Sequence, residues 1–160
     1  MSDAVSKITD AAGQLEVRRD KGKIWSHLRK KWLVETPEET VRQEYLRVLV
    51  SEYGFELNQM DEELEVTGRG SGHARADFVI WRTAKDKSDS KNPLIVVECK
   101  SDNVTIKPDD YHQGDNYSRL AGARFFVTHN SRETKFWQRR GARPTARNRS
   151  SACRTHKKIS

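Results

Sequence analysis

The chain has 160 residues, of which 34% are hydrophobic and 33% are charged, a composition that suits one domain with a modest core. Its apolar runs are too short to cross a bilayer, its first residues lack the pattern of a signal peptide, and its two cysteines are too few for a disulfide framework or a four-ligand zinc site. We therefore expect a soluble, cytoplasmic protein with no membrane partner.

The net charge of +7 is concentrated at the C-terminus. Residues 139–160 contain eight Lys and Arg residues and no Asp or Glu, so that residues 1–138 carry a net charge of about −1. Such a composition cannot form a packed core, and it predicts a disordered basic tail. The tail could attract nucleic acid through its phosphates, but the charge of the whole chain says little about the folded part.

The first 35 residues are predicted to form an N-terminal extension that is helical or mobile. Helical character is expected around residues 10–19, within an otherwise polar segment. A helix is also predicted in the first part of residues 23–35, because three apolar residues follow one another there at helical spacing: Trp25, Leu28 and Trp32.

The next predicted helix begins at Pro37 and ends near Gly54. Thr36 is suited to cap its N-terminus, and proline is favoured at the first helical position. Gly54 is suited to end it. The apolar stripe of this helix consists of Val41, Tyr45, Val48 and Leu49.

Glu44 lies close to that apolar stripe, three residues after Val41 and four before Val48. One interpretation is a boundary glutamate that pairs with Arg42 or Arg47. The other is an acid directed at whatever the helix packs against.

Two strongly apolar strands are predicted at residues 76–81 and 94–97, as neighbours in one sheet. The glycine-rich segment 68–72 (GRGSG) comes before the first of them. A phosphate-binding loop would instead follow a strand and open a helix, so we interpret this segment as a tight turn. Residues 84–93 are predicted to form a polar loop between the two strands.

A further helix is predicted to open at Pro108, and it would carry Gln113 and Tyr117 one turn apart on a single face. Two more strands are predicted after it, at residues 124–130 and 133–137.

Three charged residues occur where these strands should be buried. Asp77 lies inside the first apolar strand, and Glu98 and Lys100 end the second, on the face opposite to Cys99. A Glu-x-Lys pair can be an ordinary solvated strand end. However, a buried Asp next to a second carboxylate is costly unless a cation is bound, and oxygen ligands favour Mg²⁺ or Mn²⁺. The backbone carbonyl of Cys99 could supply a further ligand.

A lysine beside such a metal has a use in phosphodiester hydrolysis. The metal would polarise the phosphate and lower the pKa of a bound water. Lys100 could orient or deprotonate the attacking water and neutralise the developing charge.

Asp77 followed after twenty residues by Glu98-x-Lys100, behind a helix bearing Glu44, resembles the PD-(D/E)XK nuclease superfamily. Ala76 stands where a proline is common. Gln113 and Tyr117 reproduce the Q-x-x-x-Y motif of the N-terminal endonuclease domain of type I restriction enzyme R subunits. The resemblance covers residues 36–138 and implies a three-layer α/β fold with a central mixed sheet flanked by helices.

The resemblance also implies roles for individual residues. Asp77 and Glu98 would be the metal ligands, Lys100 the catalytic lysine, and Glu44 the helix acid that supports the metal. Gln113 and Tyr117 would serve cleavage, although an ordinary amphipathic helix would also carry such a pair. The implied cofactor is Mg²⁺, with Mn²⁺ as a substitute, and the implied partners are double-stranded DNA and the translocase, specificity and methylase parts of a restriction system.

Besides Ala76, the chain departs from that family in two respects: it contains no phosphate-binding loop of an ATP-driven motor, and it has no visible base-reading motif. Two functions therefore remain open. The first is a Mg²⁺-dependent endonuclease domain. The alternative is a catalytically idle nuclease fold that binds DNA or a partner protein.

Overall fold

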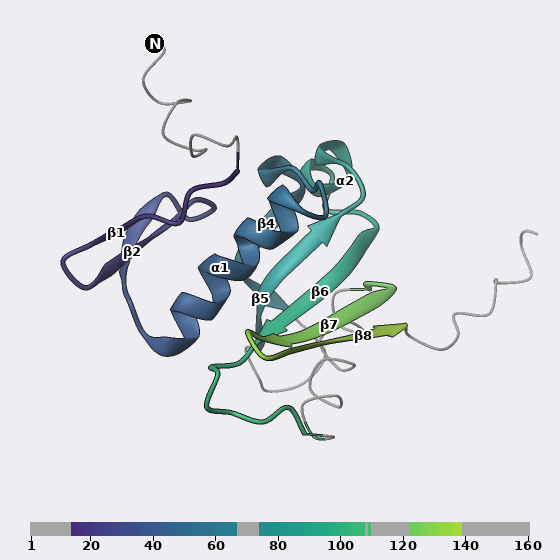
Figure 1. The fold of residues 1–160 in the computed structure, drawn as a ribbon. Helices are drawn as coiled ribbons and strands as arrows, with labels where there is room; N and C mark the ends of the chain where they lie inside the picture. The colour runs from purple at the N-terminus through teal and green to yellow at the C-terminus, as the bar shows by residue number, and fades with distance from the viewer. Residues whose placement is uncertain (1–13, 67–73, 108, 110–121, 139–160) are drawn as a thin grey trace, which may run out of the picture.

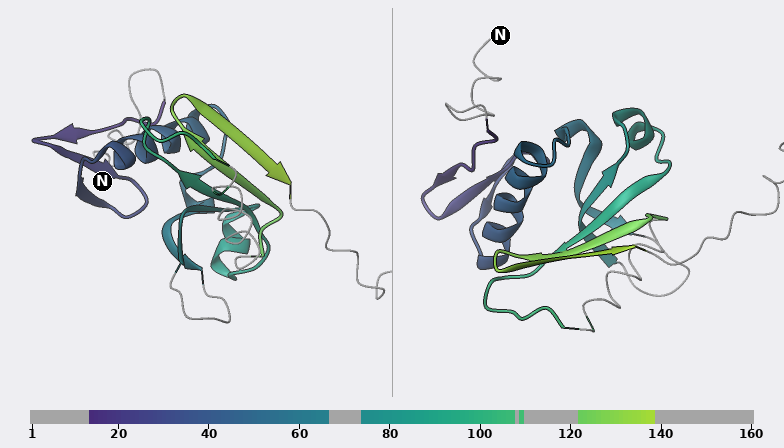
Figure 2. Two further views of the ribbon diagram at one scale, coloured as in Figure 1. Left: turned by 90° about the horizontal axis from the view of Figure 1, so that it is seen from below. Right: turned by 45° about the vertical axis from the view of Figure 1, so that its right-hand side comes forward.

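The computed structural model describes residues 14–66, 74–107, 109 and 122–138 (Figure 1). The described part consists of a small sheet, a long helix α1 and a larger sheet. Helix α1 lies between the two sheets and contacts both, as the views in Figures 1 and 2 agree. The predicted basic tail, residues 139–160, lies outside the described residues.

Helix α1 (Pro37–Ser51) forms as its sequence predicts. The Thr36 side chain accepts a hydrogen bond from the Glu39 backbone N–H, and proline occupies the first turn. Gly54, with φ of 77°, follows shortly after the helix ends and takes the left-handed conformation that glycine adopts at little cost.

The larger sheet has five strands in the order β4 (Met60–Val66), β5 (Ala74–Trp81), β6 (Pro93–Cys99), β7 (Phe125–Asn130) and β8 (Glu133–Gln138). The β6–β7 pair is parallel and the other neighbours are antiparallel. The sheet is therefore mixed. The four strands predicted at residues 76–81, 94–97, 124–130 and 133–137 all form, as β5 to β8, within two residues of those bounds.

The hydrophobic core covers both faces of this sheet. On one face, Tyr45 and Leu49 of α1 pack with Phe78, Val97 and other buried residues. On the other face a second cluster contains Val79, Trp81, Val96, Ala123 and Phe126. These clusters confirm that β6 is buried on both sides, with Val96 and Cys99 on opposite faces.

The α/β class is confirmed, whereas the three-layer arrangement stays a prediction. Helix α1 supplies one flanking layer. The helix predicted to open at Pro108 falls almost entirely on residues 108 and 110–121, which lie outside the described residues. The interpretation of residues 68–72 as a tight turn also falls outside them, although β4 and β5 on either side pair antiparallel.

The predicted helix in residues 23–35 is wrong. The segment forms a three-stranded antiparallel sheet of β1 (Arg19–Asp20), β2 (Lys23–Ser26) and β3 (Lys31–Val34). Trp25 pairs with Trp32 across β2 and β3, so a spacing of seven residues that suits a helical stripe also suits two strands joined by a four-residue turn. The helix expected around residues 10–19 is not found in its described part either, where Leu15 is buried in the core and Arg19 begins β1.

The predicted polar loop at residues 84–93 contains a short helix, α2 (Ala84–Ser88), which Thr83 caps by accepting a hydrogen bond from the Asp86 N–H. A 3₁₀ turn (Leu57–Gln59) leads into β4. None of the helices in the described part of the chain has the length and apolar character that crossing a membrane requires.

Candidate functional site

The structure brings Asp77 and Glu98 together at one end of the β5–β6 pair. Phe78 lies opposite Val97, so Asp77 and Glu98 are the next residues along the two antiparallel strands. The backbone N–H of Cys99 donates a hydrogen bond of 2.7 Å to Asp77 Oδ2. Both acids are buried, with 6% of Asp77 and 7% of Glu98 exposed, so two carboxyl groups share a poorly solvated place.

Burial and mutual repulsion disfavour the charged forms of this pair. Burial and, to a lesser extent, the charge of Asp77 raise the pKa of Glu98 to about 8, and Lys100 opposes the rise. Burial also raises the pKa of Asp77, against the opposing charge of Arg42 and the hydrogen bond from Cys99. A cation beside both carboxylates would relieve this cost.

Lys100 lies at the outer end of the pair. Its Nζ is 3.7 Å from Glu98 Oε1, and its side chain is 22% exposed, more than the 9% of the Glu98 side chain. Its backbone N–H donates to the carbonyl of His129 at 2.8 Å, which fixes the end of β6 beside β7. The ammonium group is therefore held between the buried carboxylates and solvent.

Arg42 of α1 is the cation that faces Asp77. Its guanidinium donates to Asp77 Oδ1 at 2.5 Å and to Glu39 Oε2 at 2.8 Å, and it lies 2.9 Å from Glu63 Oε1. Burial alone would lower the pKa of Arg42, but these carboxylates raise it, so the side chain stays charged. The sequence suggests Arg42 only as a partner of Glu44, because nothing in a single helix indicates which strand residue it will meet.

The helix acid near the carboxyl pair is Glu38, not Glu44. The charge of Glu38 raises the pKa of both Asp77 and Glu98, and its side chain is 54% exposed at 3.6 Å from Arg42. Glu44 instead accepts a hydrogen bond of 3.0 Å from Arg19. The structure therefore does not bring Glu44 to the site, since its turn of α1 faces the N-terminal segment rather than β5 and β6.

The buried polar contacts continue from Arg42 to the small sheet. Gln43 donates to Glu39 at 2.9 Å and to Glu62 of β4 at 2.6 Å, and Ser26 of β2 donates to the other oxygen of Glu62. The Glu62 side chain has no exposed area, and its burial raises its pKa. Hence a chain of polar side chains joins the small sheet to Asp77 through the interior.

The donor set suits a hard divalent cation in part. Asp77 and Glu98 offer carboxylate oxygens, and the backbone carbonyl of Cys99 follows directly in sequence. Within the described ranges, no group of three or more His, Cys, Asp and Glu side chains is arranged to hold a metal. Two carboxylates are nevertheless enough for Mg²⁺, which keeps several of its water ligands in protein sites.

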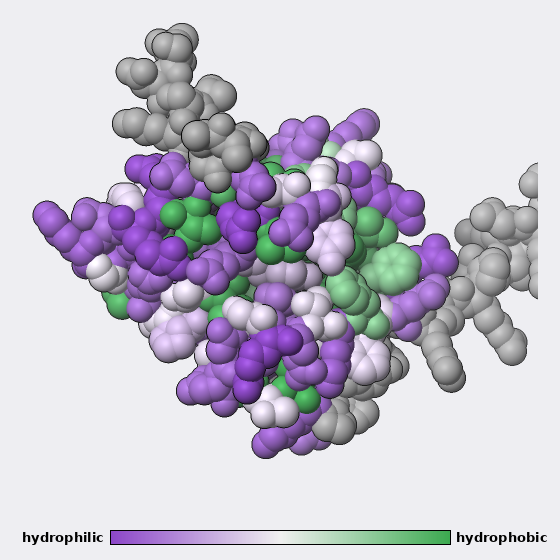
Figure 3. Space-filling view, in the orientation of Figure 1, coloured by the Kyte–Doolittle hydropathy of each residue, from purple (hydrophilic) through white to green (hydrophobic). Residues whose placement is uncertain are grey.

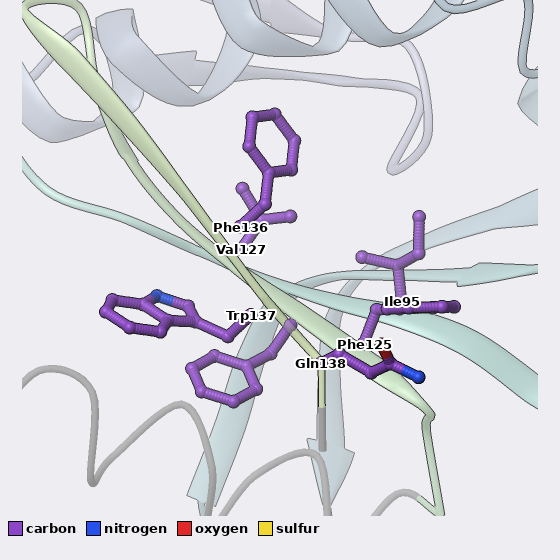
Figure 4. Close-up of a pocket in the computed structure, with 7 residues that line it drawn as sticks. Ile95, Phe125, Val127, Phe136, Trp137 and Gln138 are labelled. Atoms are coloured by element: carbon purple, nitrogen blue, oxygen red, sulfur yellow. The ribbon is translucent and has the colours of Figure 1, made fainter. Parts of the chain in front are cut away.

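An apolar cavity of about 250 Å³ lies elsewhere on the large sheet, over β7 and β8. Figure 4 shows Val127 and Phe136 projecting to one side of these strands and Trp137 to the other. None of the charged residues discussed above lines this cavity, so it is separate from the carboxyl pair. Two further predicted site residues, Gln113 and Tyr117, lie outside the described residues.

Comparison with protein-family models assigns the chain to a family. A search of curated proteins finds no relative. A family model for the N terminus of the type I restriction enzyme R protein matches residues 37–148, the part of the chain that holds α1, the large sheet and the buried carboxyl pair. The chain therefore belongs to the family of type I restriction enzyme R protein N-terminal regions, with a nuclease-like role in restriction.

Proposed function

We propose that this chain is a Mg²⁺-dependent endonuclease domain that hydrolyses phosphodiester bonds of double-stranded DNA. The observation that carries the proposal is the meeting of Asp77, Glu98 and Lys100 at the end of two neighbouring strands. Membership of a restriction enzyme family supports DNA as the substrate. The other subunits of a restriction system, namely translocase, specificity and methylase, are the proposed protein partners.

Asp77, Glu98 and the carbonyl of Cys99 would hold the metal, and Glu38, whose charge acts on both carboxyl groups, would be the helix acid that supports it. When bound, the metal supplies a polarised phosphate and a water of lowered pKa. Lys100 orients the attacking water and offsets the negative charge that develops on the phosphate. The burial of the two carboxylates strengthens each of these electrostatic effects, because they act in a region of low polarity.

Arg42 would have to release its hydrogen bond to Asp77 when the metal binds. Its guanidinium donates to Asp77 Oδ1, on the carboxyl group that would hold the metal. Glu39 and Glu63 hold the same guanidinium at 2.8 and 2.9 Å, so Arg42 stays paired if Asp77 turns to the metal. Because no buried charge is left unpaired in either state, the exchange avoids the penalty of an isolated ion.

Cleavage of supercoiled plasmid tests the proposal. The native chain is incubated with Mg²⁺ or Mn²⁺, in parallel with Lys100→Ala and with Lys91→Ala, in which an exposed loop lysine is removed. We expect metal-dependent nicking by the native chain and by Lys91→Ala, and at least a hundredfold slower nicking by Lys100→Ala.

Three other results would point elsewhere. Equal nicking by Lys100→Ala would contradict the assigned site. If no version cuts although Mn²⁺ raises the melting temperature, the domain needs another subunit for cleavage. If the metal neither stabilises the chain nor supports cleavage, the alternative of an idle fold that binds DNA or a partner takes its place.

A further inference from the structure

The small N-terminal sheet carries a positive charge that the rest of the fold lacks. Residues 14–35 contain seven Lys and Arg residues and three Asp and Glu residues, a net charge of +4. Residues 37–138 contain fourteen basic and eighteen acidic residues, a net charge of −4. The family match begins at residue 37, so this sheet is a feature that the match does not describe.

The positive charge is presented by two turns of the sheet. Lys21 and Lys23 lie at the β1–β2 turn, and Lys30 and Lys31 lie at the β2–β3 turn, all four exposed. None of these four lysines makes an ion pair with another residue of the described ranges. They are therefore available to an external anion, whereas Arg19 is already bound to Glu35 and Glu44.

A tryptophan pair stiffens the face between the two turns. The Trp25 and Trp32 rings meet edge to face at 5.5 Å, and the Arg18 guanidinium lies 5.5 Å from the centre of each ring. Because the rings already contact one another and Arg18, they are poorly placed to stack on bases. The lysines remain the groups that can bind, so the chemistry of this face favours phosphate over base.

The opposite face of the sheet is anchored to the domain that holds the carboxyl pair. Ile24 and Ser26 are buried, and Ser26 donates to Glu62. Arg29 lies 3.7 Å from Glu62 and 3.9 Å from Glu39, the carboxylate that also binds Arg42. The sheet is consequently a fixed part of the folded unit, and Figure 3 shows hydrophilic side chains gathered over it to the left of α1.

We propose that Lys21, Lys23, Lys30 and Lys31 form a surface that binds the phosphate backbone of the DNA duplex. This inference rests on the proposed nuclease function and assigns the surface that holds its substrate. The part of the fold formed by residues 37–138 is net negative and repels a polyanion, so productive binding requires a positive surface attached rigidly to the site. The duplex is favoured over a single strand because the Trp25 ring and the Trp32 ring, which is 37% exposed, already contact each other and Arg18.

Amine labelling locates the contact in the whole chain. The protein is mixed with a 30-base-pair duplex in EDTA, treated with an amine-reactive reagent, and the modification of each lysine is read by mass spectrometry. We expect the duplex to slow the labelling of the four surface lysines at least threefold. The labelling of Lys85, within α2, and of Lys91, which follows α2, should stay unchanged. Unchanged labelling of the four lysines while the duplex is bound overturns the proposal.

The salt dependence of binding measures how many phosphates are contacted. The variant Lys21→Gln, Lys23→Gln, Lys30→Gln, Lys31→Gln is compared with a control of equal charge change at other exposed positions: Arg82→Gln, Lys85→Gln, Lys91→Gln, Arg124→Gln. Duplex binding is followed by fluorescence anisotropy in EDTA between about 50 and 200 mM salt. Four lost contacts should weaken binding at least tenfold and reduce the slope of log K against log salt by about 3.6.

The outcomes separate this proposal from the proposed function. If the surface variant binds and cuts like the native chain while Lys100→Ala does not cut, the nuclease assignment stands and the surface is wrong. If the surface variant loses binding but the native chain is neither stabilised by Mn²⁺ nor able to cut, the surface stands and the nuclease assignment fails. An equal loss of duplex affinity in the control variant overturns the assignment of the surface, because binding would then follow total charge alone.

Discussion

Glu98→Gln is predicted to change the pH dependence of stability in the absence of metal. In the folded state, burial and the charge of Asp77 raise the pKa of Glu98 to about 8, above the ordinary value of 4.5 expected of the unfolded chain. Folding therefore favours the protonated carboxyl group. Its contribution to stability is fully present below about pH 4.5 and is lost as the pH rises to about 8.

The size of the effect follows from the linkage relation. Each pH unit between these two values costs about 1.4 kcal/mol, so that roughly 3 kcal/mol is lost between pH 5 and pH 7.5. Because Asp77 shares the repulsion, this figure is an upper bound. A glutamine at position 98 keeps the shape and a hydrogen-bonding group but has no charge to gain, so its contribution stays constant over this range.

Urea unfolding in EDTA at pH 5, 6, 7 and 8 measures the difference between native and Glu98→Gln. Burial also raises the pKa of Glu62 and lowers that of His129 to about 4, but these groups are common to both chains and cancel in the comparison. The titration of Asp77 is linked to that of Glu98, so its change is part of the measured difference. We expect the free energy of unfolding of Glu98→Gln to rise relative to that of the native chain as the pH rises. An exposed control, Glu52→Gln, should show no such trend. A constant difference between native and Glu98→Gln across this pH range would refute the reasoning.

Three further predictions concern α1 and its contacts. Arg42→Met leaves Asp77, Glu39 and Glu63 without their shared cation, and should lower the free energy of unfolding by about 3 to 5 kcal/mol in urea titrations at pH 7; a loss below 1 kcal/mol would mean that the pairs contribute little. Thr36→Ala removes the cap on the Glu39 N–H and should cost about 1 kcal/mol in the same titration, whereas no loss would show that water replaces the cap. Glu38→Gln should weaken Mn²⁺ binding in calorimetry severalfold while Glu44→Gln leaves it unchanged, and the reverse order would restore Glu44 to the site.

Strands β5, β6 and β7 of the large sheet could be predicted from the sequence because they contain short apolar runs bounded by polar segments. The β5 and β6 runs also locate Asp77 and Glu98, since a charge inside such a run requires a partner. Helix α1 could also be predicted, because Thr36 and Pro37 define its start by local interactions that do not depend on the rest of the fold.

The small sheet could not be predicted in the same way. The separation of Trp25 and Trp32 fits a helical stripe and a cross-strand pair equally well, and the choice depends on contacts with α1 that are distant in sequence. The same limit applies to Glu38, Glu44 and Arg42. Helical spacing places them near an apolar stripe, but the rotation of α1 against the sheet decides which of them faces Asp77.

Calorimetric titration of Mn²⁺ into the metal-free chain at pH 7 tests most directly whether Asp77 and Glu98 form one metal site. We expect the native chain to bind Mn²⁺ and Asp77→Asn to lose this binding. Binding should also release up to one proton, because Glu98 must ionise to act as a ligand. The proton count follows from repeating the titration in buffers of different ionisation enthalpy. No binding by the native chain, or equal binding by native and Asp77→Asn, would contradict the account.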